Sequence, residues 1–192
     1  MKDLTLFLLC ILAIFTYILY GRKYLYLSRV KSEIDENYYF VRNLHNKQEA
    51  SNKLSELGIK LGELVDKCNA DSEERKRKIE KLKKSFNRNS ITENIPGSLY
   101  AAYSVNKGEE LSICIRDKKT EEFIDNNTLM FVCIHELSHI MSDDIGHTTE
   151  FWDNMKYLLL EAEKVGLYQP VDYSSYPKEY CGELIDSTPL NL

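Results

Sequence analysis

The sequence predicts an α+β protein: a small domain of helices plus a β-hairpin or small sheet, behind one N-terminal transmembrane helix. Three observations lead to this fold class. Residues 4–20 carry no charge. Apolar residues recur at helical spacings of three and four within residues 40–68, and an apolar helical segment surrounds the HELSH sequence at 135–139. Two short runs typical of strands, 99–105 and 110–116, flank the turn sequence NKGE.

The composition limits what the chain can be. Hydrophobic residues make up 43% and charged residues 29% of the 192 residues, a balance typical of one folded domain with an appendage. The net charge of −5 does not favour a nucleic-acid binder. The five cysteines are an odd number without a CxxC pair, so we expect neither a disulfide framework nor a cysteine-built zinc site. This cysteine usage is typical of a reducing compartment.

The uncharged run at residues 4–20 predicts a membrane anchor. A helix of that length spans about 25 Å, close to the thickness of a thin bilayer. No A-x-A-like cleavage site follows the run, so an uncleaved anchor is favoured over a signal peptide. Positive charge is concentrated after the run, at Arg22, Lys23, Arg29 and Lys31. Because positive flanks stay on the cytoplasmic side, we expect the rest of the chain to face the cytosol.

A strongly basic segment, ERKRKIEKLKK at 74–84, follows the first predicted helix of the domain. The sequence NADSEE separates the two helices, and Ser72 or Asp71 can cap the second. We interpret the basic segment as the solvated face of that helix. Contact with anionic lipid headgroups or with nucleic acid is the alternative interpretation.

The two short strands at 99–105 and 110–116 predict a hairpin. We expect the second strand to be a sheet edge that binds a substrate backbone by strand addition. After the hairpin, Asp125 or Asn127 caps a helix that contains HELSH. A second helix covers 150–165 after the break SDDIG, and the segment beyond it is expected to lie over the core.

The stretch IHELSHIMSDDIGHTTEFW contains three of the four histidines. His135 and His139 are four residues apart, so they share a helix face and can bind one metal ion through their imidazole nitrogens. Glu136 lies about 100° around the helix, beside such an ion, where it can move a proton from a zinc-activated water to a leaving amine. Hydrogen-bonded core histidines are the alternative, but burying these three side chains in an apolar helix is costly unless something satisfies them.

A catalytic zinc site needs a third protein ligand and one open position. His147, eight residues after His139 and beyond Gly146, is the leading candidate. The alternative ligands are carboxylates: Glu150, Glu161, Glu163, Asp143 and Asp144. Glu150 could instead orient a ligand through a hydrogen bond, and His45 is interpreted as a surface histidine. Three tyrosines could offer a hydroxyl to a tetrahedral oxyanion: Tyr173, Tyr176 and Tyr180.

HELSH, a short insert and then GHTTEFW resemble the WLM and SprT-like branch of zincin metallopeptidases. The resemblance implies that His135, His139 and His147 bind zinc and that Glu136 is the general base. Residues 40–185, including YSVNKGEELSICIRD and EYCGELI, also resemble metallopeptidases encoded by large DNA viruses, which implies no particular substrate. The spacing differs from HExxHxxGxxH of the metzincins, so their Met-turn is not expected. Many WLM proteins act on protein crosslinked to DNA, but no DNA-binding module is evident in this sequence.

We therefore predict a membrane anchor at residues 1–22, a neck at 23–39 and a zincin-like metallopeptidase domain at 40–192. The expected function is Zn²⁺-dependent hydrolysis of protein or peptide substrates by a single-pass membrane protein of a virion or host membrane. Its anchor in the lipid bilayer would be residues 4–20. The alternatives are a zinc-binding interaction protein with weak catalysis and a DNA-associated protease. Nucleic acid is not an expected partner, and the sequence does not indicate the oligomeric state.

Overall fold

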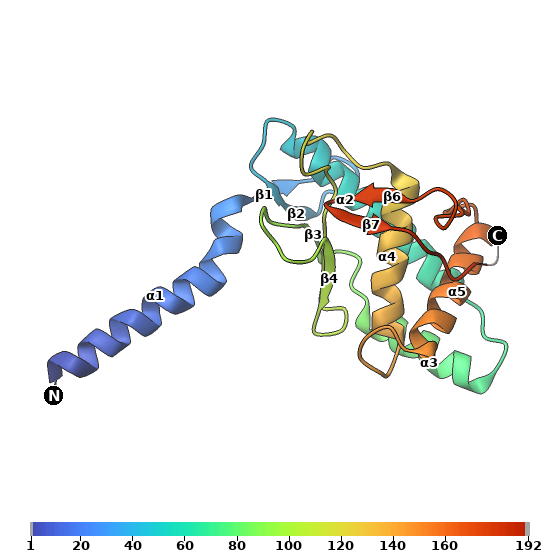
Figure 1. The fold of residues 1–192 in the computed structure, drawn as a ribbon, viewed down its shortest axis with the longest axis horizontal. Helices are drawn as coiled ribbons and strands as arrows, with labels where there is room; N and C mark the ends of the chain where they lie inside the picture. Colours follow the sequence, from blue (N-terminus) through green and yellow to red (C-terminus); the bar gives the residue numbers. More distant parts are fainter. Residues whose placement is uncertain (1, 191–192) are drawn as a thin grey trace.

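The computed structural model describes residues 2–190, which contain five helices and seven strands (Figure 1). The α+β class of the domain is confirmed. In chain order the elements are α1 (Lys2–Tyr26), β1 (Leu27–Lys31), β2 (Tyr38–Arg42), α2 (Lys47–Lys67), α3 (Glu73–Ser85), β3 (Ile91–Glu93), β4 (Ala102–Val105), β5 (Glu110–Ile113), α4 (Asn126–Met141), α5 (Thr149–Lys164), β6 (Lys178–Tyr180) and β7 (Glu183–Ile185).

Helix α1 projects away from the rest of the molecule (Figure 1), and residues 4–17 are exposed. The expected transmembrane anchor is nevertheless wrong. No helix in residues 2–190 combines the length and the apolar character that crossing a membrane requires. The uncharged run at 4–20 reaches only about 25 Å as a helix, short of a hydrocarbon core of about 30 Å. The single-pass membrane location is therefore wrong as well, and the orientation inferred from the anchor has no support.

A five-stranded sheet in the order β1-β2-β3-β5-β4 forms one layer of the domain. Strand β3 lies parallel to β2 and β5, whereas β1 pairs antiparallel with β2 and β4 pairs antiparallel with β5. Tyr39 and Val41 of β2 are 1% and 0% exposed because alternate residues of a strand face the same side, here the core. The residues expected to form a neck, 23–39, therefore contribute to this sheet, which begins before residue 40.

The predicted hairpin is confirmed, with Ala102 of β4 opposite Ile113 of β5. Its turn has positive φ angles at Asn106, Lys107 and Gly108. The expected edge strand is wrong, however, because β5 lies inside the sheet between β3 and β4, and β4 is the edge. The apolar residues of β5 fit an internal strand that is covered on both faces, whereas β4 is only partly buried.

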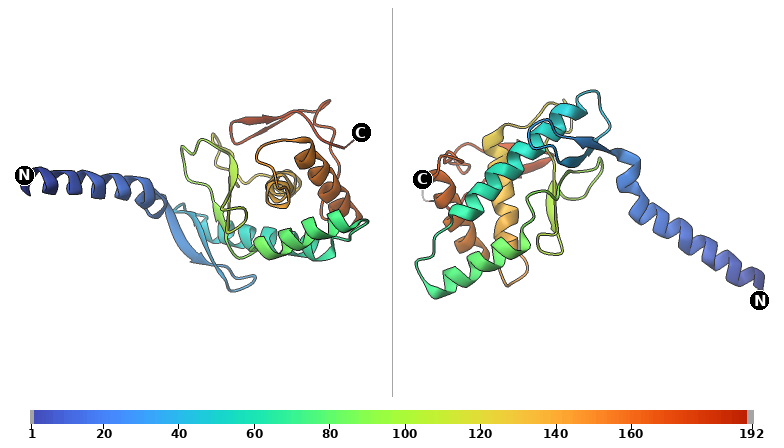
Figure 2. Two further views of the ribbon diagram at one scale, coloured as in Figure 1. Left: turned by 90° about the horizontal axis from the view of Figure 1, so that it is seen from below. Right: turned by 180° about the vertical axis from the view of Figure 1, so that it is seen from behind.

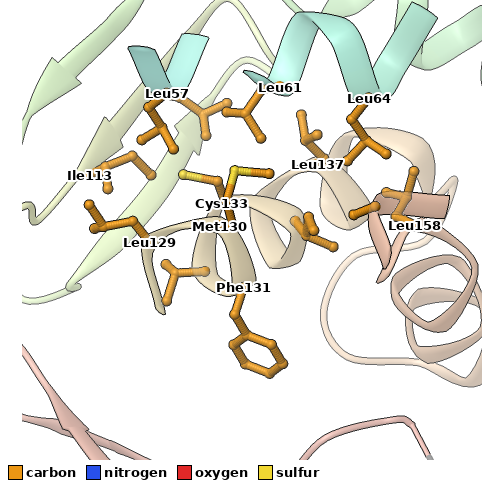
Figure 3. Packing of buried hydrophobic residues seen from close by; sticks show 14 of the residues in the cluster. Leu57, Leu61, Leu64, Ile113, Leu129, Met130, Phe131, Cys133, Leu137 and Leu158 are labelled. Carbon is orange, nitrogen blue, oxygen red and sulfur yellow. The ribbon is translucent and has the colours of Figure 1, made fainter. Parts of the chain in front are cut away.

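Helix α4 lies at the centre of the helical layer, and Figure 2 (left) views it nearly along its axis among the other elements. It contacts α2, α3, α5 and β4. Figure 3 shows the apolar side chains that join α4 to α2 and α5, and those labelled include Met130, Cys133 and Leu137 of α4, Leu57, Leu61 and Leu64 of α2, and Leu158 of α5. A helix surrounded in this way is buried on nearly every side, so polar residues within it need a specific reason to be there.

Hydrogen bonds identify the residues that cap α3 and α4. Ser72 accepts a hydrogen bond from the backbone N–H of Arg75 at the start of α3, and Asp125 accepts one from the N–H of Thr128 at the start of α4. Both were among the predicted capping residues. Such caps satisfy N–H groups that have no partner inside the helix, which fixes where each helix begins.

The C-terminal segment forms the β6–β7 hairpin, which buries Tyr180 and Cys181 against the domain. Cys181 makes a disulfide with Cys114, which follows β5. The expectation that the chain has no disulfide framework is wrong for this pair. Cysteine number and spacing do not reveal which distant cysteines the fold brings together. Cys133 is a free cysteine buried in α4.

Candidate metal centre and active-site cleft

The HELSH motif lies in the C-terminal half of α4. Its two histidines, His135 and His139, are one helical turn apart, and their Nε2 atoms are 3.2 Å apart. Ile134, Leu137 and Ile140 of the same helix are 0% exposed. Their burial fixes the rotation of α4, so the two partly buried imidazoles turn together toward one cleft.

His147 reaches the same point from the loop between α4 and α5. The loop turns at Gly146, whose φ of 87° is a left-handed conformation that favours glycine. His147 Nε2 lies 3.0 Å from His135 Nε2, and the candidate ligand atoms of the three histidines lie within 4.8 Å of one another. A tetrahedral zinc ion with Zn–N bonds of about 2.0–2.1 Å separates its ligands by about 3.3–3.4 Å. The spacing around His135 therefore suits ligands of one shared ion.

Phe151 forms an apolar floor under the three imidazoles. Its side chain is 0% exposed, and its ring centroid lies 4.8, 4.4 and 4.7 Å from those of His135, His139 and His147. Thr148 caps α5 by accepting a hydrogen bond from the Phe151 N–H, so the helix begins at Thr149, two residues after His147. The aromatic ring thus limits how far each imidazole can move.

Burial keeps the histidines of α4 neutral. It lowers the pKa of His135 to about 3, assisted by the positive charge that His139 and His147 would carry. The pKa of His139 falls to about 4 for the same main reason, with smaller contributions from His147 and Lys107. A metal ligand must present an unprotonated imidazole nitrogen. Both histidines meet that condition at neutral pH.

Glu136 lies beside the histidines and is 6% exposed. Burial raises the pKa of its carboxyl to about 7, and the nearby charge of Glu183 adds to the rise. A hydrogen bond from the backbone N–H of Ser104 in β4 acts in the opposite direction and orients the carboxylate. A carboxyl group with a pKa near neutrality is suited to both accepting and donating a proton.

A cleft of about 670 Å³ is lined by the three histidines and Glu136. Residues 100–104, which include most of β4, line one part of it, and residues 183–187, which include β7, line another. The loop before α5 contributes residues 145–147, and Trp152 of α5 also lines the cleft. The cleft therefore has a sheet edge alongside a cluster of imidazoles and a carboxyl group, an arrangement in which an extended chain can lie beside reactive groups.

None of the three tyrosines considered for an oxyanion presents a free hydroxyl to this cleft. Tyr173 is 1% exposed and packs on Phe131, and Tyr176 is 75% exposed outside the cleft. Tyr180 does line the cleft, but its hydroxyl donates a hydrogen bond of 2.8 Å to the Cys114 carbonyl oxygen. Tyr103 of β4 also lines the cleft and was missed from the sequence.

The alternative carboxylate ligands lie apart from the histidine cluster. Within the part of the chain that the structure describes, the group that could hold a metal consists of the three histidines alone. Glu150 pairs with Lys78, and Glu161 pairs with Lys164. Glu163, Asp143 and Asp144 are exposed. His45 is exposed in the turn before α2, as expected for a surface histidine.

Besides Tyr103, three further residues of the site were not predicted from the sequence. Phe151 had a usable signal, because it is an aromatic residue only four positions after His147, in the first turn of the next helix. Ser104 and Glu183 had none. Ser104 acts through its backbone, and Glu183 accepts a hydrogen bond from the backbone N–H of Ala101 across the cleft. Contacts between segments so far apart in sequence cannot be found from local patterns.

Comparison with known proteins gives a family and several viral relatives. The WLM domain matches residues 36–176. An uncharacterized protein of Acanthamoeba polyphaga mimivirus, R325, is 33% identical over 162 residues, which is 83% of this chain and 82% of that protein. The uncharacterized protein 136R of Invertebrate iridescent virus 6 is 37% identical over 82 residues, 42% of this chain and 44% of the relative. Protein 042R of Invertebrate iridescent virus 3, also uncharacterized, is 40% identical over 80 residues, covering 42% and 48%. No solved structure matches the chain.

Proposed function

Because the chain belongs to the WLM domain family, a family of zincin-like metallopeptidases, we propose that it is a zinc-dependent peptidase that hydrolyses peptide bonds in protein or peptide substrates. The observation that carries the proposal is the convergence of His135, His139 and His147 beside the buried carboxyl group of Glu136 in one cleft. The expected resemblance to WLM proteins and to viral proteins is confirmed by the family match and the relatives.

The donor set fits zinc. Three imidazoles supply nitrogen ligands at a spacing near that of a tetrahedral ion, and the two in α4 are held neutral by burial. Three protein ligands leave a fourth position open to the cleft, which is the arrangement of catalytic rather than structural zinc sites. We therefore assign zinc binding to His135, His139 and His147.

Glu136 is assigned the role of general base and acid. When bound, zinc supplies Lewis acidity that polarises the scissile carbonyl and makes water a stronger nucleophile. The Glu136 carboxylate accepts a proton from the attacking water and returns it to the leaving amine. The Ser104 N–H holds this carboxylate on the side of the cleft that β4 lines, where the substrate backbone would lie.

The substrate is proposed to be an extended peptide segment. Strand β4 is the edge of the sheet and lines the cleft, so a peptide can add to it through backbone hydrogen bonds. The cleft also carries large apolar side chains that are exposed to solvent, including Tyr100 at 64%, Ile145 at 91% and Leu184 at 62%. Exposed apolar surface of this kind favours contact with apolar side chains of a substrate.

The proposal is tested by metal content and metal-dependent cleavage. We expect the purified chain to contain about one zinc per molecule, as a site with three protein ligands requires. Cleavage of an unfolded protein should stop when zinc is removed with a chelator and return when zinc is added. Each of His135→Ala, His139→Ala and His147→Ala should bind zinc much more weakly. Unchanged affinity in His147→Ala would remove it from the ligand set.

The two alternative functions correspond to other outcomes of the same test. A zinc-loaded chain that cleaves no substrate would favour an interaction protein that keeps the site without turnover. Cleavage that requires DNA would favour a DNA-associated protease. No contact in the described part of the chain favours a DNA-associated protease, because much of the basic segment at 74–84 is engaged in contacts within the protein.

A further inference from the structure

The loop that carries His147 needs support from outside itself. Residues 143–147 are all exposed, and Ile145 is 91% exposed. Neither neighbouring helix includes these residues. A ligand on such a loop would sample many positions unless other contacts hold the loop, and a metal site requires its ligands to be close to their final positions.

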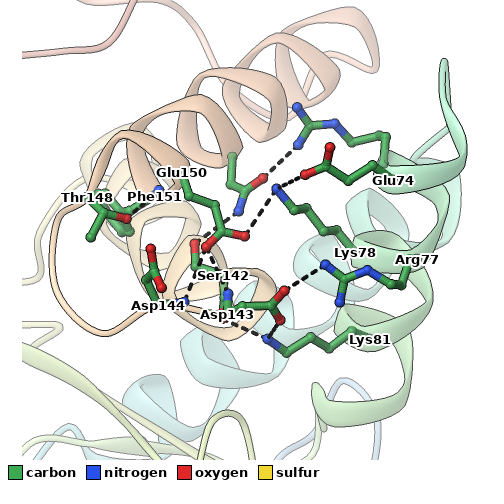
Figure 4. Close-up of polar contacts among 12 residues, drawn as sticks. Glu74, Arg77, Lys78, Lys81, Ser142, Asp143, Asp144, Thr148, Glu150 and Phe151 are labelled. Atoms are coloured by element: carbon green, nitrogen blue, oxygen red, sulfur yellow. Dashed lines mark hydrogen bonds and ion pairs between the residues drawn. The ribbon is translucent and has the colours of Figure 1, made fainter.

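Helix α3 supplies those contacts through Lys78 (Figure 4). Lys78 is 8% exposed, which is unusual for a lysine, and its Nζ lies 3.1 Å from Glu150 Oε1. The other oxygen of Glu150 accepts hydrogen bonds from the backbone N–H groups of Asp143 and Asp144, at 3.1 and 3.2 Å. A single chain of contacts therefore runs from α3 through Glu150 to the backbone of the loop.

Other cations hold the same loop from α3 and from the β4–β5 turn. Lys81 Nζ donates to the Ser142 carbonyl oxygen at 2.7 Å and pairs with Asp143, which also pairs with Arg77. Lys107 Nζ donates to the carbonyl oxygens of Ser142 and Asp143. The Arg77 and Asp143 side chains are more exposed than those of Lys78 and Glu150, so solvent weakens their pair more.

We propose that Lys78 and Glu150 are positioning residues that hold His147 at the metal site. The inference rests on the proposed function, because it assumes that His147 binds zinc. The two residues act through the loop backbone and do not touch the ion. Because these contacts already hold the loop, the loop loses less conformational entropy when His147 binds the metal.

The basic segment at 74–84 thus has a role within the protein. It was interpreted from the sequence as a solvated helix face or as a surface for anionic lipid or nucleic acid. Arg77, Lys78 and Lys81 face the loop and contact it or Glu150, so they are not simply a solvated helix face. Lys76 on the same helix has a side chain that is 56% exposed, and its ion pair with Glu73 is a long one of 3.9 Å. Lys76 is therefore a matched control for Lys78, because it has the same charge and lies on the same helix.

The test compares zinc affinities of Lys78→Met and Lys76→Met in the full-length protein, measured by competition with a chromophoric chelator. We expect Lys78→Met to weaken zinc binding by roughly 10–100-fold, the usual effect of removing a residue that orients a metal ligand. Glu150→Gln, which keeps the shape of the side chain, should also weaken binding. Lys76→Met should match the wild type. Cobalt(II) absorption spectra should change in Lys78→Met and not in the control.

A second comparison separates positioning from general destabilisation. In a His147→Ala background the loop carries no ligand, so adding Lys78→Met should cause no further loss of zinc affinity. An equal additional loss in that background would overturn the inference, as would equal affinities for Lys78→Met and Lys76→Met. If the wild type binds no zinc, or if His147→Ala binds as well as the wild type, the proposed metal site fails instead.

Discussion

The Cys114–Cys181 disulfide should make a large and measurable contribution to stability. The two cysteines are separated by 67 residues. In the chain-entropy treatment, a crosslink across a loop of that length removes unfolded-state entropy worth about 4 kcal/mol at 25 °C. For a chain of this size each kcal/mol moves the melting temperature by about 2–4 °C, so reduction should lower it by roughly 8–16 °C.

The measurement is urea or thermal unfolding of the metal-free protein with and without a phosphine reductant. A variant in which both cysteines are replaced by alanine serves as the control, and its unfolding should not respond to the reductant. Mass spectrometry of peptides from the unreduced protein establishes that the bond is present. If oxidised and reduced wild type unfold at the same midpoint although the bond is verified, the entropic reasoning is refuted.

Loss of the disulfide should also affect substrate binding. The bond ties the β6–β7 hairpin to the end of β5, and residues 183–187 of the hairpin region line the cleft. The hairpin supplies a wall of the cleft and none of the zinc ligands. Reduction is therefore expected to raise KM more than it lowers kcat, and a fall in kcat alone would contradict this placement.

Two further predictions concern buried charge. Arg116 and Glu93 form an ion pair of 2.8 Å with both side chains 1% exposed. Arg116→Met should leave the buried carboxylate without its cation and lower the free energy of unfolding, measured by urea titration, by about 3–5 kcal/mol. The double variant with Glu93→Met should be more stable than Arg116→Met alone, and the reverse order would contradict the reasoning. The metal-free protein should lose stability as pH falls below about 6.5. In that range His135 becomes protonated in the unfolded chain but stays neutral in the folded state, where its pKa is about 3. Glu136 opposes this loss, since its raised pKa of about 7 lets the folded state bind a proton first. Urea midpoints at pH 7.5 and pH 5 should therefore differ more in Glu136→Gln than in the wild type, and equal differences would count against these shifts.

The sequence predicts the part of the site whose residues are close together in the chain. His135 and His139 are four residues apart in one helix, and helix geometry alone brings them together. His147 follows after a short break with a glycine, so its return to the same point is a short-range event. The hairpin at β4 and β5 was equally local, and its turn residues carried the signal.

Features that depend on contacts between distant segments could not be predicted. The order of strands in the sheet places β5 inside and β4 at the edge, and no local pattern contains that order. The Cys114–Cys181 bond, the Ser104 contact to Glu136 and the Lys78–Glu150 pair each join segments separated by tens of residues. The predicted anchor failed for another reason, because the absence of charge over residues 4–20 does not establish that a helix combines the length and the apolar character that crossing a membrane requires.

The central claim is that Glu136 performs proton transfer at a zinc site, and Glu136→Gln tests it most directly. The variant keeps the shape of the side chain and all three histidines, so zinc content should be unchanged. Cleavage of an unfolded protein by zinc-loaded variant should fall at least roughly 10²–10⁴-fold below zinc-loaded wild type, the usual effect of losing a general base. Equal cleavage by the two zinc-loaded proteins would contradict the assigned role of Glu136.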